Sequence, residues 1–270
     1  MLKDKQIVKL VDFANSSDCF PKVNIAGGIS YFLWRKNANE DCEITNMSQG
    51  KVVSVVKRDL SQYSILVRNN NAYDTIQKIL GEPEMMMSSR VRSRNSFNLP
   101  SNFRGHSTKA EGDYMLLTSN GTSYVKPQRL NVSDELLSQY KVVITYAMSG
   151  GNKPSSDGSY QIISSLTILK PQEICTETFL VLDAFKSEQE AMGLYNYAKT
   201  KFFRFLLLQS LTSIHITKDT FRFVPLQDFS ANSDINWNQS VADIDKQLYA
   251  KYNLSPDEIA FIEKMIKPME

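Results

Sequence analysis

The sequence contains few cysteines and histidines and no long apolar run. Its 270 residues include three cysteines and two histidines. Cys19, Cys42 and Cys175 are far apart and lack C-x-x-C spacing, so they indicate neither a disulfide framework nor a zinc site. Every apolar run is shorter than the roughly 20 residues of a membrane-spanning helix, and the N-terminus lacks the apolar core of a signal peptide. We therefore expect a cytoplasmic protein without a membrane partner.

The common catalytic motifs are missing as well. No G-x-S-x-G, H-E-x-x-H, Walker or G-x-G-x-x-G motif occurs. His106 and His215 have no ligand partners nearby in sequence, which is typical of surface or packing histidines. The residues therefore predict no catalytic group and no metal ligand, and they favour a protein that is not an enzyme on its own.

Charge is balanced over the whole chain but not along it. The total is 31 Lys+Arg against 29 Asp+Glu, a net charge of +2. Residues 85–130 hold seven basic and two acidic side chains, a net of +5, and residues 199–222 hold five and one, a net of +4. Residues 228–270 hold eight acids and four lysines, a net of −4. Two basic segments and an acidic tail indicate a polar molecule that could bind a polyanion.

Hydrophobic periodicity predicts an α+β fold, with a β-rich mixed domain followed by a long helix and a small C-terminal helical bundle. The predicted strands cover residues 6–14, 27–35, 51–60, 64–69, 114–121, 123–127, 141–149, 161–171 and 177–185. The predicted helices cover 71–82, 187–213, 240–252 and 255–266. Asn71 is the expected cap of the first helix, and Ser255 with Glu258 has the spacing of a capping box. The Asn120–Gly121 pair indicates a hairpin.

The R-V-R-S-R run at residues 90–94 is the most suggestive basic motif. In an extended backbone its arginines alternate with small residues, so all three would point to one side. Such a comb could lie along DNA phosphates or present a guanidinium fork to guanine. The alternative is a solvated surface loop. In the 187–213 helix, Lys199 and Lys201 suit phosphate contacts, but side chains that snorkel over a core would have the same pattern.

Several stretches resemble the C-terminal half of adenine-specific DNA methyltransferases from type II (type IIG-like) restriction–modification systems. They are FPKVNIAGGISYFLWRK (20–36), SFNLPSNFRG (96–105), ICTETFLVLDAF (174–185), LYNYAKTKFFRFLL (194–207), DTFRFVPLQDF (219–229) and QLYAKYNLSPDEIAFIEKMIKPM (247–269). Asn98 and Ser101 replace the glycine and threonine that are usual in the second stretch. The family's glycine-bearing S-adenosylmethionine loop and its N-P-P-Y motif are both missing here.

The resemblance implies a division of the chain and a function. Residues 1–36 would be terminal strands of a methyltransferase catalytic domain, and residues 37–270 a target-recognition domain with a helical C-terminal part. The chain would then recognise a double-stranded DNA sequence, need no cofactor of its own although the parent enzymes use S-adenosylmethionine, and pair with a methyltransferase catalytic domain or subunit. The expected DNA contacts are Arg90, Arg92, Arg94, Asn98, Asn102, Arg104, Lys109 and Lys153, followed by Lys199, Lys201, Lys218 and Arg222. Tyr31, Phe32 and Trp34 would pack against the catalytic half.

Two other classes of protein stay open. One is a complete enzyme with diverged motifs, which a thermal shift on adding S-adenosylmethionine would favour. The other is a separately encoded specificity subunit that docks on a catalytic methyltransferase or endonuclease chain by protein–protein contacts.

Overall fold

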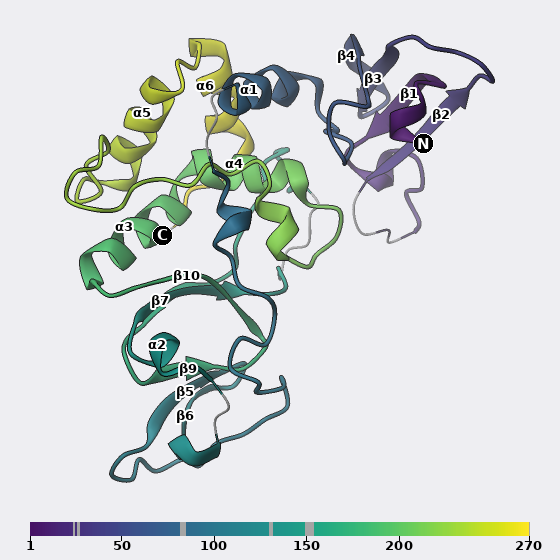
Figure 1. Ribbon diagram of the computed structural model, residues 1–270. Helices are drawn as coiled ribbons and strands as arrows, with labels where there is room; N and C mark the ends of the chain where they lie inside the picture. The colour runs from purple at the N-terminus through teal and green to yellow at the C-terminus, as the bar shows by residue number, and fades with distance from the viewer. Residues whose placement is uncertain (24, 26–27, 82–84, 130–131, 149–153, 270) are drawn as a thin grey trace.

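The structure is a computed structural model that describes residues 1–23, 25, 28–81, 85–129, 132–148 and 154–269. It confirms an α+β protein with helices toward the C-terminus. Figure 1 shows a sheet of N-terminal strands at one end, helices in the middle, and the strands β5, β6 and β9 at the other end. Within the described part of the chain, no helix is long and apolar enough to cross a membrane.

The N-terminal sheet has the strand order β2-β1-β3-β4. Its strands are β1 (Ile7–Phe13), β2 (Ile29–Trp34), β3 (Cys42–Ser48) and β4 (Lys51–Arg58). β1 pairs antiparallel with β2 and parallel with β3. Three of these strands match the predictions for 6–14, 27–35 and 51–60, whereas β3 was not predicted because polar residues interrupt its apolar pattern. The domain boundary expected after residue 36 falls inside this one sheet.

The strand predicted for residues 64–69 is wrong. This stretch has no strand partner. Side chains of the sheet donate hydrogen bonds to two of its carbonyl groups instead. Arg58 Nη2 donates to the carbonyl of Val67 at 2.8 Å, and Asn46 Nδ2 donates to that of Arg68 at 2.9 Å. The stretch ends at Asn69, whose side chain caps α1 (Asn70–Leu80). The cap therefore lies two residues before the predicted cap, Asn71.

Two three-stranded sheets form the middle of the chain. One has the order β10-β7-β8, from Phe179–Phe185, Tyr140–Thr145 and Leu166–Leu169; the other has the order β6-β5-β9, from Gly121–Val125, Tyr114–Thr118 and Glu173–Cys175. The predicted hairpin is confirmed, since β5 and β6 are antiparallel and Gly121 has φ +100°. β7 separates two cores, because Val142 and Ile144 pack among the helices while Val143 packs toward β5.

The C-terminal helices are α3 (Glu188–Lys199), α4 (Lys201–Ser210), α5 (Val241–Lys251) and α6 (Pro256–Met265). A shorter helix, α2 (Asp134–Leu137), precedes β7. The capping box of α6 is confirmed, with the Ser255 side chain accepting from the backbone N–H of Glu258 and the Glu258 carboxylate accepting from that of Ser255. Most of the largest buried side chains belong to one core cluster that includes residues of α3 to α6, of α1 and of the β10-β7-β8 sheet.

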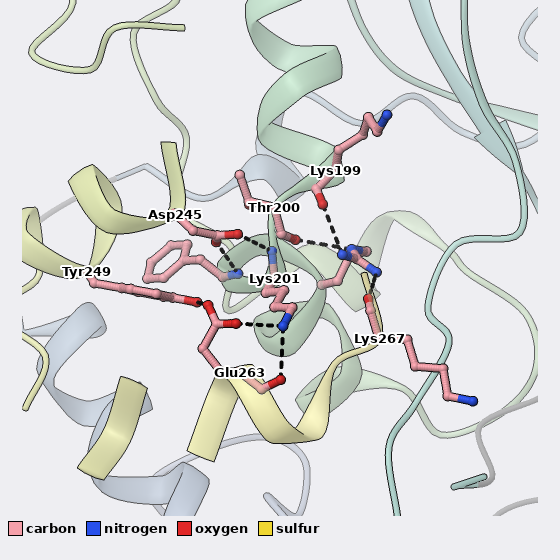
Figure 2. Close-up of polar contacts among 9 residues, drawn as sticks. Lys199, Thr200, Lys201, Asp245, Tyr249, Glu263 and Lys267 are labelled. Atoms are coloured by element: carbon pink, nitrogen blue, oxygen red, sulfur yellow. Dashed lines mark hydrogen bonds and ion pairs between the residues drawn. The ribbon is translucent and has the colours of Figure 1, made fainter. Parts of the chain in front are cut away.

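The single long helix predicted for 187–213 is two helices that meet at Thr200. Thr200 has an extended backbone (φ −63°, ψ 151°), ends α3, and caps α4 by accepting from the N–H of Phe203. The carboxylate of Asp245 on α5 accepts from the N–H groups of Lys201 and Phe202, each at 2.9 Å (Figure 2). In an uninterrupted helix these two N–H groups would donate to backbone carbonyls of the preceding turn. Asp245 supplies the acceptors instead, so the break between the helices is stable.

Candidate nucleic-acid interface

The basic motif lies in an irregular stretch, residues 90–104, which we call the arginine segment. It runs along β10: the N–H of Arg92 donates to the carbonyl of Val181, and the N–H of Glu177 donates to that of Leu99, each at 2.9 Å. Val91, Phe97 and Leu99 are buried and fix the segment to the two cores. The segment is therefore an ordered surface element, and the alternative of a loosely solvated loop is not what the structure contains.

The prediction of an extended backbone with all three arginines on one side is wrong. Arg90 has helical backbone angles (φ −100°, ψ −35°) because it ends the 3-10 turn Met87–Ser89. Its Nε donates to Asp183 Oδ2 on β10 at 2.8 Å, and the Asp183 carboxylate is nearly buried. Arg90 therefore ties the segment to β10 through an ion pair rather than joining a row of free cations.

Arg94 is held by contacts on two elements. Its guanidinium carbon lies 4.3 Å from the ring centroid of Tyr146, directly after β7. Its Nε donates to the Glu177 carbonyl at 3.4 Å, and Nη2 lies 3.5 Å from Glu177 Oε1. Tyr146 in turn stacks on His215, with ring centroids 4.8 Å apart and an interplanar angle of 19°. Arginine, tyrosine and histidine thus form one surface stack.

Arg92 differs from both neighbouring arginines. Its backbone is fixed by the bond to Val181, but its side chain is exposed and has no hydrogen-bond or ion-pair partner among the described residues. The exposed side chains of Asn102 and Lys109 likewise have no such partner there. These three groups are available for an external ligand without breaking an internal contact.

The rest of the segment is shaped by turns. Asn95 and Asn98 have left-handed backbone angles, φ 65° and 54°, a conformation that asparagine tolerates better than most residues. Arg104 Nη1 donates to the carbonyls of Ser101 and Phe103, within its own turn. The predicted contacts Asn98 and Arg104 thus lie on this surface, with Arg104 partly engaged.

A short loop carries Lys109 beyond the segment. His106 Nε2 lies 2.6 Å from Asp113 Oδ2, and the N–H of Ala110 donates to the same carboxylate oxygen at 2.7 Å. The hydrogen bond with His106 lowers the pKa of Asp113. The backbone of His106 also pairs with Tyr124 of β6. These contacts close the loop so that Lys109 stands at its exposed side.

The second group of predicted DNA contacts is mostly engaged within the protein. Lys201 Nζ contacts Glu263 Oε2 at 2.5 Å and also donates to the Glu263 carbonyl at 3.0 Å (Figure 2). Arg222 donates to the carbonyl of Asp219 and to the hydroxyl of Ser64. The roles of Lys201 and Arg222 in binding DNA stay predictions. Each side chain has internal contacts that give it a structural role.

Lys199, Lys218 and Lys153 complete the predicted set. The ammonium of Lys199 lies 5.8 Å from the ring centroid of Tyr195, and its carbonyl accepts from the buried Arg204. Lys218 is exposed in the 3-10 turn Lys218–Phe221. Lys153 lies outside the described residues. Among the described residues, no hydrogen bond or ion pair joins Lys199 or Lys201 to the arginine segment.

A separate cleft of about 470 Å³ lies between the N-terminal sheet and α4. The buried carboxylate of Asp12 accepts from both Nε and Nη2 of Arg68 within it, at 2.9 and 2.8 Å. Asp12 is the one carboxylate among the described residues that line the cleft. Both bonds go to Oδ1 of Asp12, so Arg68 binds one oxygen of this carboxylate. Among the described residues, no three His, Cys, Asp or Glu side chains gather to hold a metal.

Sequence reasoning missed the groups that organise the arginine segment. Tyr146, Glu177 and Asp183 come from residues far along the chain, and no local motif marks them. A weak sign existed for Tyr146, an aromatic residue inside the strand predicted for residues 141–149. His215 was noticed only as an isolated histidine.

Comparisons with known proteins give a weak structural match. No protein-family model matches the sequence, and no curated protein is similar to it. Among solved structures, the type IIG restriction endonuclease BpuSI is similar, with a TM-score of 0.39 and 9% sequence identity, covering 97% of this chain and 43% of that chain. The chain thus spans less than half the length of BpuSI.

Proposed function

We propose that this chain is a sequence-specific recognition module for double-stranded DNA, belonging to an adenine-specific methyltransferase of a type II restriction–modification system. The observation that carries the proposal is Arg92, an unpaired and exposed cation on a segment that is fixed to β10 by its backbone. A fixed backbone with a free side chain suits a phosphate contact. Binding then does not cost the free energy of ordering the loop.

In the proposed mechanism, this chain binds the duplex and a catalytic partner carries out the methylation. Arg92, Lys109 and Asn102 contact the phosphates and sugars of the duplex, which supplies most of the affinity and makes it depend on salt. Methylation of an adenine amine requires that the base leave the stack, and a catalytic domain or subunit holds that base. The present chain supplies position on the duplex and choice of sequence.

The catalytic partner is proposed to pack against β2. Tyr31, Phe32, Leu33 and Trp34 of this edge strand are all exposed, between 45% and 59%. Strand edges with large apolar side chains are usually covered. The cofactor is proposed to bind to that partner, so adding S-adenosylmethionine to this chain alone should leave its melting temperature unchanged. A clear rise would favour a complete enzyme instead.

The first test is binding of the chain to a short labelled duplex, measured by fluorescence anisotropy between about 50 and 200 mM salt. Of the proposed contacts, the cations Arg92 and Lys109 neutralise phosphates, so the affinity should fall roughly 12-fold over this range. Arg92→Ala should weaken binding and reduce the slope of log K against log salt by about 1. Lys246→Ala removes an exposed cation of α5 and is the matched control, because it should change neither. Binding that ignores salt would contradict the proposal.

The exposed β2 strand also favours the second candidate, a separately encoded specificity subunit. In that case a catalytic chain should copurify with this one when the two are coexpressed. Tyr31→Glu with Leu33→Glu should abolish copurification and leave DNA binding by the isolated chain intact. Copurification that survives both substitutions would argue against docking on β2.

A further inference from the structure

Two arginines of the segment differ in how much freedom their side chains have. Arg94 is restrained by the Tyr146 ring at 4.3 Å and by two approaches to Glu177, at 3.4 and 3.5 Å. Arg92, two residues earlier, has a fixed backbone but an unrestrained side chain among the described residues. The two side chains are both exposed on the same stretch, so their different restraint calls for different roles.

Reading a base requires a fixed direction, whereas neutralising a phosphate does not. A guanidinium that donates two parallel bonds to guanine O6 and N7 must hold its plane in the plane of the base pair. A side chain already stacked on a ring loses less freedom on binding than a free one. A phosphate accepts donors from many directions, and a mobile arginine serves it well.

The internal contacts of Arg94 leave donors for such a reading. Glu177 approaches Nε and Nη2, and both distances are longer than those of a tight bidentate pair. No partner of Nη1 is found among the described residues, and the Arg94 side chain is 46% exposed. Tyr146 is itself backed by His215 and by backbone bonds, in which the N–H of Ile216 donates to the Tyr146 carbonyl and the N–H of Tyr146 donates to that of Thr178. Tyr146 directly follows β7 and Thr178 directly precedes β10, so the support lies at the ends of two strands.

We infer that Arg94 is the residue of this segment that reads a base, with a guanine edge as its ligand, and that Tyr146 and Glu177 are positioning residues. Arg92 holds a phosphate. The inference rests on the proposed function, since it assigns roles within that DNA interface. It assigns sequence choice to Arg94, whereas the spacing of R-V-R-S-R alone gives no reason to prefer one arginine.

The test uses conservative variants of the full chain and selection from a randomised duplex library. Arg94→Lys keeps the charge but removes the planar fork, so it should bind DNA with an unchanged salt slope while losing roughly 5- to 150-fold preference at one base pair. Arg92→Lys is the matched control and should select the same sequence as wild type. Glu177→Gln should weaken the preference, and Tyr146→Phe should retain it because the ring remains.

The outcomes separate this inference from the function on which it rests. A wild-type chain that binds no duplex refutes the proposed function. A chain that selects a sequence equally well with Arg94→Lys refutes the role of Arg94 and leaves DNA recognition standing, as does one in which Arg92→Lys alone loses the preference. Wild-type binding without any sequence preference also overturns the inference. Circular dichroism melting of each variant checks that a lost preference is not lost folding.

Discussion

Asp245 makes the stability of the helical part depend on pH in an unusual direction. Its carboxylate, 3% exposed, accepts from the first two N–H groups of α4. Burial raises the pKa of Asp245 to about 6, which the bonds from Phe202 and Lys201 offset only in part. An unfolded aspartate has a pKa near 3.9. Between these values the folded protein keeps a proton that the unfolded chain has lost, so this group's contribution to stability falls as the pH rises.

The size of the effect follows from the two pKa values. With about 6 folded and about 3.9 unfolded, raising the pH from about 5 to about 8 removes roughly 1.4 kcal/mol of the free energy of unfolding. Asp245→Asn cannot titrate, and it keeps one of the two acceptor oxygens to which Lys201 and Phe202 donate. Asp245→Ala leaves two buried N–H groups without an acceptor and should cost about 2–5 kcal/mol.

The assay is urea unfolding followed by circular dichroism at both pH values. The free-energy difference between wild type and Asp245→Asn should shift by about 1.4 kcal/mol in favour of the variant on going from about pH 5 to pH 8. Other titrating groups are common to both proteins, so the difference isolates this carboxyl. Parallel pH profiles for the two proteins would refute the reasoning, as would a difference of the opposite sign.

Three further predictions concern local features. Burial raises the pKa of Cys42 to about 11 and of Cys175 to about 12, so a thiol reagent should modify Cys19 first and the other two only on unfolding; equal rates in the folded protein would contradict this. Ser255→Ala removes the cap of α6 and should cost about 1 kcal/mol in urea unfolding, whereas no loss would mean that the capping box adds nothing. A Cβ at Gly105 would lie 2.2 Å from the Tyr124 carbonyl oxygen, so Gly105→Ala should lower the melting temperature, and an unchanged value would show that the loop can move aside.

Local features of the fold were predictable because their partners are close in sequence. The capping box of α6 joins residues three positions apart, and the hairpin at Gly121 needs only a turn between two strands. The break at Thr200 was not predictable in this way. It depends on Asp245, more than forty residues further along, and apolar residues continue on both sides of Thr200 in the sequence.

The candidate site divides in the same way. The basic character of the arginine segment is a property of its sequence, and so is its lack of regular structure. Which arginine is free is decided by Asp183 and Glu177, more than eighty residues away, and by Tyr146. Composition counts all three arginines equally, whereas the folded chain pairs Arg90, restrains Arg94 and leaves Arg92 open.

The most direct test of the central claim is hydrogen exchange of the chain with and without duplex DNA at low salt. If the arginine segment and the Lys109 loop grip the duplex, amides within residues 90–109 should exchange more slowly when DNA is bound, and those of α5 and α6 should be unchanged. Slowed exchange confined to α5 and α6, or none at saturating duplex, would contradict the account.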